Sequence, residues 1–191
     1  MAMPVLPFPE ARRYTVAEVL DFPPDGNRYE VVEGALLVTP APRYRHQVIV
    51  GRLVARLREY LSPMGYGDAV LTSPADITWG RSPRDADDLV QPDVFMLDPR
   101  DHPNEWLDVT RLALAVEVAS PGSTHADRID KRMTYQRHAV ETYWVVDPDA
   151  RLIKVWQPHD DRPLIVTDVL TWAYGQSGVE LRVPLAELSS A

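Results

Sequence analysis

The stretch from Leu112 to Ala119 is apolar throughout except at Glu117. A strand with apolar side chains on both sides belongs inside a sheet that is covered on both faces, because only there do both sides escape water. This stretch therefore predicts the central strand of an α/β fold, which we expect to contain a mixed sheet. A carboxylate in such a strand is costly unless a cation neutralises it, so Glu117 is also the first candidate for a functional group.

The segments on either side of this strand complete a simple order. Apolar residues recur at helical spacing in the long segment before the strands, and Thr124 to Asp127 has the form of a capping box at the start of a later helix. The predicted core is therefore helix, three strands, helix and strand. The expected ranges are helix 44–61, strands 68–79, 90–97 and 112–119, helix 124–139 and strand 142–146.

Further elements are expected at both ends of this core. A short helix over 15–20 precedes a hairpin over 28–38 that turns at Glu33-Gly34. The last part of the chain reads as antiparallel strands over 152–156, 164–172 and 179–183. With 191 residues and no internal repeat, the chain is expected to form a single domain over residues 1–191.

Composition excludes several classes of function. The absence of cysteine excludes disulfides and thiolate metal sites, and no phosphate-binding or dinucleotide-binding glycine motif is present. No apolar run approaches the ~18 residues of a membrane span and no signal peptide is visible, so a cytoplasmic protein is expected. The net charge of −8 argues against binding along an extended stretch of nucleic acid, so any contact between this protein and nucleic acid is expected to be confined to a local patch.

Asp93 and Glu117 are the strongest pair of candidate ligands. Asp93 follows Pro92 at the start of an apolar run, where a strand-edge aspartate is the plain alternative. Glu117 lies between two valines, where a structural ion pair is the alternative to a ligand role. Two such carboxylates favour a hard divalent cation such as Mg²⁺ or Mn²⁺.

Lys131 is the candidate cation beside this pair. It is one of only two lysines among 20 basic residues, the others being arginines. The choice of lysine suggests that this position requires the compact charge of an ammonium group. Asp127 lies four residues earlier, so an ordinary surface ion pair on a helix is the alternative.

Glu30 and His46 are secondary candidates. Glu30 lies in a predicted strand and is a possible third carboxylate of a metal shell, directly or through water. His46 lies on the inward face of the long helix, where it either packs in the core or positions a phosphate or water. We interpret the acids Asp85, Asp87 and Asp88 as a solvated loop.

These residues occur in a pattern that resembles the Uma family of restriction-endonuclease-like proteins, within the PD-(D/E)XK nuclease superfamily. The resemblance covers most of the chain. It rests on spaced motifs, which are Arg28-Tyr29-Glu30 with Gly34, His46-Gln47, Pro92-Asp93-Val94, Glu117-Val118 with Ser120-Pro121 and Ser123-Thr124, Asp127-Arg128 with Lys131 and Tyr135, and Glu141 with Tyr143 to Pro148.

The resemblance implies a core of helix, three strands, helix and strand, with a metal held by Asp93 and Glu117. The superfamily pattern places a lysine two residues after the second acid, where this chain has Ala119, so Lys131 would take its place. The implied function is an Mg²⁺-dependent endonuclease acting on DNA, for which a homodimer would serve to cut both strands. A non-catalytic metal- or nucleic-acid-binding protein and a phosphoesterase acting on small nucleotides remain alternatives.

Overall fold

The centre of the protein is a six-stranded mixed sheet. The computed structural model describes residues 12–79, 82, 86–120, 125–175 and 178–189. The strand order is β3-β4-β5-β6-β7-β8, in which β5 and β6 are parallel and the other neighbours antiparallel. The strands are β3 (Val70–Thr72), β4 (Val94–Leu97), β5 (Leu112–Val118), β6 (Thr142–Asp147), β7 (Leu152–Trp156) and β8 (Leu164–Val166).

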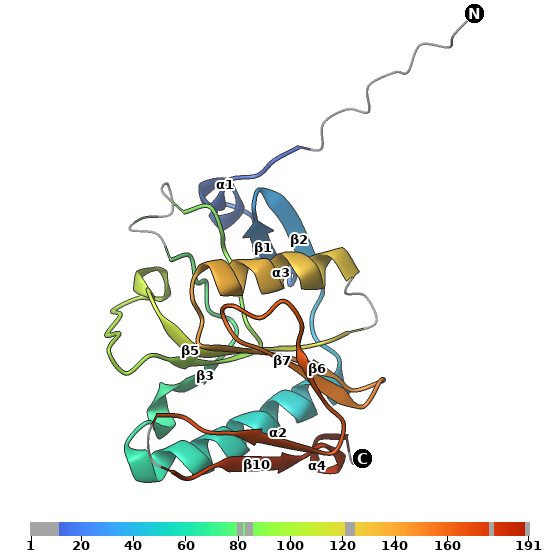
Figure 1. Ribbon diagram of the computed structural model, residues 1–191. Coiled ribbons are helices and arrows are strands. Elements are labelled where there is room, and N and C mark those ends of the chain that lie inside the picture. Colours follow the sequence, from blue (N-terminus) through green and yellow to red (C-terminus); the bar gives the residue numbers. More distant parts are fainter. Residues whose placement is uncertain (1–11, 80–81, 83–85, 121–124, 176–177, 190–191) are drawn as a thin grey trace, which may run out of the picture.

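Two helices cover opposite faces of this sheet, α2 (Tyr44–Leu61) on one and α3 (His125–Arg137) on the other (Figure 1). Side chains of β5 alternate between these faces. Leu114 and Val116 pack in the cluster that contains the apolar face of α2, whereas Ala115 packs with Tyr135 of α3. Glu117 lies two residues after Ala115, so it points to the α3 side. The predicted mixed-sheet α/β fold with the order helix, three strands, helix and strand is confirmed.

A hairpin and a short helix lie on the α3 side. Helix α1 (Val16–Leu20) begins with a capping box between Thr15 and Glu18, and the hairpin consists of β1 (Arg28–Val32) and β2 (Ala35–Thr39). Two backbone hydrogen bonds of 2.8 Å join Val31 to Leu89. This bridge holds β1 beside the segment that leads into β4.

A small second sheet packs on the α2 side (Figure 1). It contains β9 (Val169–Trp172) and β10 (Leu181–Pro184), which is followed by helix α4 (Leu185–Ser189). Their apolar side chains extend the cluster around α2. Among the described helices, none combines enough length with enough apolar character to cross a membrane.

Several predicted boundaries were wrong. The strand expected over 68–79 contains the short helix η2 (Gly67–Ala69) and then only β3, because Pro74 cannot donate to a ladder; Ile77 merely bridges Val90. The strand expected over 164–172 is split into β8 and β9, which join different sheets. Helix α4 and the 3-10 helices η1 (Ser62–Met64) and η3 (Trp106–Asp108) were not predicted.

Candidate active site

The candidate site lies between the α3 side of the sheet and the hairpin. Asp93 comes directly before β4 and Glu117 is near the end of β5. Since Val94 pairs with Val116 in antiparallel register, the two carboxylates are neighbours across the ladder. Helix α3 brings Lys131 to the same place. Strand β1 supplies Arg28 and Glu30, and α2 supplies His46, so the chain assembles the site from distant segments.

Asp93 is a buried carboxylate with both oxygens hydrogen-bonded. Its Oδ1 accepts from Nη1 of Arg28 at 2.8 Å, and its Oδ2 accepts from the backbone N–H of Val118 at 2.8 Å. His46 Nε2 lies 3.0 Å from the same Oδ2. Burial alone raises the pKa of Asp93, but the His46 hydrogen bond and the Arg28 charge outweigh it and lower that pKa to about 2. Asp93 is therefore an anion at neutral pH, and His46 Nε2 must carry the hydrogen.

Glu117 receives two donors from α3 on one oxygen. Lys131 Nζ lies 3.0 Å and the Tyr135 hydroxyl 2.9 Å from its Oε1. Burial, together with the charges of Asp93 and Glu30, raises the pKa of Glu117 to about 7 against the opposing effect of Lys131 and Arg28. The carboxylates around Lys131 overcome its own burial and raise the pKa of the ammonium, so Lys131 stays charged.

Glu30 is fully buried and holds the other side of the ammonium. Its Oε2 lies 2.8 Å from Lys131 Nζ, while its Oε1 accepts the backbone N–H of Gln91 at 2.7 Å. The Gln91 side chain donates in turn to Asp76 at 2.7 Å. Burial first, and then the Glu30 charge, raise the pKa of Asp76. Lys131 is thus fixed between two carboxylates, Glu30 and Glu117.

A model of the Uma2 family, described as "Putative restriction endonuclease", matches residues 16–182. The chain belongs to the Uma2 family. No curated protein matches it significantly. Among solved structures, the chain is similar to a protein described as a putative nuclease belonging to DUF820 from Anabaena variabilis, with a TM-score of 0.68 and 19% identity. The match covers 93% of this chain and 98% of that one, so the two share a fold over almost their whole length.

The side chains of this Uma2 protein offer the type of ligand atom that a hard divalent cation prefers, because Asp93, Glu117 and Glu30 place carboxylate oxygens close together. The crowding of these anions, visible in the raised pKa of Glu117, is what a dication would relieve. Within the described residues, however, no group of three or more histidine or acidic side chains is arranged to hold a metal. The ion pairs with Arg28 and Lys131 would have to open for a cation to enter.

The candidate residues Asp93, Glu117, Lys131, Glu30 and His46 all lie in this one network. Their roles stay predictions. Arg28 and Tyr135 were not among the predicted site residues, although both belong to the family motifs and both contact a candidate carboxylate. The side chain of Asp127 lies outside the described residues.

The interpretation of Asp88 as a solvated acid was wrong. Asp88 is fully buried and accepts from the N–H of Glu33 at 2.9 Å and from Nη2 of Arg137 at 2.6 Å, with His138 Nε2 at 3.1 Å. It therefore ties the hairpin to the end of α3. Asp87 is exposed as expected, and Asp85 lies outside the described residues.

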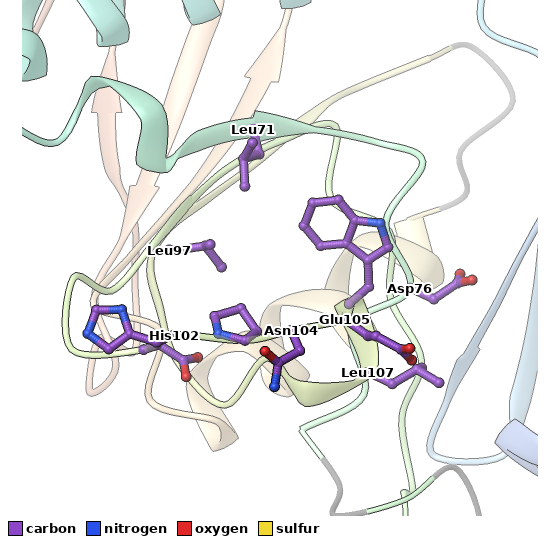
Figure 2. A pocket seen from close by; sticks show the side chains of 10 residues that line it. Leu71, Asp76, Leu97, His102, Asn104, Glu105 and Leu107 are labelled. Atoms are coloured by element: carbon purple, nitrogen blue, oxygen red, sulfur yellow. The ribbon is translucent and has the colours of Figure 1, made fainter.

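A separate cavity of about 1000 Å³ lies over the outer strands β3 and β4 (Figure 2). Leu71 and Leu97 line one side, and residues 101–107 line the other. None of the candidate residues lines it, although Asp76, which does, accepts a hydrogen bond from Gln91. This cavity is therefore separate from the carboxylate network that contains the candidate residues.

Proposed function

We propose that this Uma2 protein is a divalent-metal-dependent endonuclease that hydrolyses phosphodiester bonds in DNA. The observation that carries the proposal is the position of Lys131, whose Nζ lies 3.0 Å from Glu117 although the strand itself offers only Ala119. Two carboxylates and one ammonium at a single point are the groups that metal-assisted phosphodiester hydrolysis needs. Family membership supports the same reaction class.

Asp93 and Glu117 would hold the cation, which is Mg²⁺ or Mn²⁺. When bound, such an ion supplies Lewis-acid polarisation of the phosphate and a more acidic water. Lys131 would donate to the attacking water or to the phosphoryl oxygens as their charge builds. Glu30 keeps the ammonium in place, and His46 orients Asp93 through Nε2.

The direct test is incubation of the purified full chain with supercoiled and linear DNA in Mg²⁺, in Mn²⁺ and in EDTA. We expect cleavage only with the metals, and a loss of about 100-fold or more in Asp93→Ala and Glu117→Ala. Asp149→Ala is the matched control, since Asp149 pairs with Arg45 on the exposed surface and lies outside the network. Equal cleavage by the control and the two site variants would refute the assignment.

A non-catalytic metal- or nucleic-acid-binding role is the second candidate. It is favoured by the hydrogen bonds that already occupy both oxygens of Asp93. Calorimetric titration with Mn²⁺, followed by the cleavage assay on the same sample, separates the two functions. Binding without turnover of DNA supports this candidate, whereas turnover of a small phosphodiester alone supports a nucleotide phosphoesterase.

A further inference from the structure

Arg28 is the cation of the site that has no role in the proposed reaction. Its Nη1 donates to Asp93 Oδ1 at 2.8 Å and to the carbonyl oxygen of Gln91 at 3.2 Å. Its Nε is 3.9 Å from Glu30 Oε2 and, within the described chain, is buried with no hydrogen-bond partner. Among the described residues, its hydrogen bond to a carboxylate therefore goes to one oxygen of the proposed metal ligand, while Glu117 and Glu30 act on it through their charges.

The charges around the Arg28–Asp93 ion pair indicate how this pair would respond to a bound metal ion. Glu30, Asp93 and Glu117 are the carboxylates, and Arg28 and Lys131 are the permanent cations that face them. Lys131 lies between two carboxylates and its side chain is 10% exposed, whereas the Arg28 side chain is 20% exposed. A dication that bound Asp93 would meet the positive charge of Arg28 at the same oxygen. Repulsion at such a distance is large in a partly buried site, so the contact between Arg28 and Asp93 would have to open. Lys131 would also release Glu117 but could keep its ion pair with Glu30, whereas Arg28 has no second carboxylate within hydrogen-bonding distance among the described residues.

We propose that Arg28 is a displaceable counter-ion: it neutralises Asp93 in the metal-free protein and binds the phosphodiester of the substrate once a metal has taken Asp93. This inference rests on the proposed function. A guanidinium released from Asp93 presents a planar fork of donors, which matches the two non-bridging oxygens of a phosphodiester. It also supplies the local positive charge that an acidic protein with a net charge of −8 needs to hold DNA.

The experiment compares the wild-type chain with Arg28→Met, which keeps the length of the side chain and removes its charge. We expect Arg28→Met to bind Mn²⁺ about tenfold more tightly by calorimetry, because no counter-ion has to be displaced. We expect it to bind a short DNA duplex about tenfold more weakly by fluorescence anisotropy in Ca²⁺, but equally to wild type in EDTA. The loss of any nearby positive charge favours metal binding, so the metal-dependent difference in DNA affinity is the result that a purely structural arginine would not give.

Two further variants make the comparison sharp. Arg28→Lys keeps the charge but not the fork, so its Mn²⁺ affinity should stay within about twofold of wild type while its DNA affinity in Ca²⁺ falls. This variant also serves if Arg28→Met does not fold. Arg56→Met is the matched control, since Arg56 pairs with Glu59 and Glu187 on the surface of α2, and its loss changes the net charge equally.

The outcomes separate the two hypotheses. Wild-type protein that binds Mn²⁺ and cuts DNA, with unchanged or weaker Mn²⁺ binding in Arg28→Met, overturns the role of Arg28 and leaves the nuclease proposal intact. Wild-type protein that neither binds Mn²⁺ nor cuts DNA refutes the proposed function, and the role of Arg28 falls with it.

Discussion

Replacing Glu117 with glutamine tests the electrostatics of the site without any assay of activity. Glu117 has an ordinary pKa of 4.5, and burial beside Asp93 and Glu30 raises that pKa to about 7 in the folded protein. The folded state therefore binds this proton more tightly than the unfolded state. The resulting stabilisation is complete below pH 4.5 and is lost as pH rises through 7.

The size of the effect follows from the two pKa values. Each pKa unit corresponds to about 1.4 kcal/mol, so the full loss is roughly 3 kcal/mol, of which about 2 kcal/mol falls between pH 5.5 and pH 8. Asp93 does not contribute in this window. Its pKa is lowered to about 2, so its stabilising effect is present above 3.8 and is lost only as pH falls through 2.

The measurement is the free energy of unfolding from urea titrations at several pH values between 5.5 and 8, for the wild type and for Glu117→Gln in EDTA. The difference between the two curves cancels the other titrating groups, which both proteins share. We expect the wild type to lose about 2 kcal/mol relative to the variant across this range. A difference that stays constant within 0.5 kcal/mol, roughly the effect of an ordinary surface group, would refute the raised pKa and the crowding of carboxylates behind it.

Three more predictions test the supports of the site. Tyr135→Phe removes a donor that favours the ionised form of Glu117, so the acid limb of the cleavage profile should move to higher pH, as measured by initial rates against pH. Ala119→Lys in a Lys131→Met background should regain part of the lost cleavage, because residue 119 lies on the same side of the strand as Glu117; no recovery at any pH would contradict this. Asp88→Ala leaves the Arg137 guanidinium without its buried partner and should cost about 2–4 kcal/mol in urea unfolding, against less than about 1 kcal/mol for Asp149→Ala on the surface.

The core could be predicted because its signals are local. The apolar positions of α2 repeat at helical spacing and fixed the helix at 44–61, and the double-sided apolar run of β5 located the centre of the sheet. In both segments, the spacing of the apolar residues along the chain directly shows which faces of the helix or strand are buried. The tail was harder to predict, since nothing in the sequence over 164–172 shows that β8 extends the large sheet while β9 pairs with β10.

The second network was missed because its signal is not local. Asp88 stands among other acids in a polar stretch, which is the pattern of a solvated loop. Its partners Arg137 and His138 are about 50 residues away, and they meet it only because the hairpin and the end of α3 close over it. The same holds for Arg28, whose partner Asp93 is 65 residues away. A lone sequence shows that a carboxylate needs a cation, but the fold decides which one.

The relocated lysine follows from how α3 crosses the end of β5. Lys131 and Tyr135 stand four residues apart on one face of the helix, so both donors reach the same oxygen of Glu117. The position of this face is set by Tyr135, whose ring is fully buried and packs 4.6 Å from the ring of Tyr143 on β6. A lysine at position 119 would depend only on its own strand, whereas Lys131 depends on the docking of a whole helix. The position of the ammonium therefore depends on the contacts that hold α3 against the sheet and the hairpin, among which are those of Arg137 and His138 with Asp88.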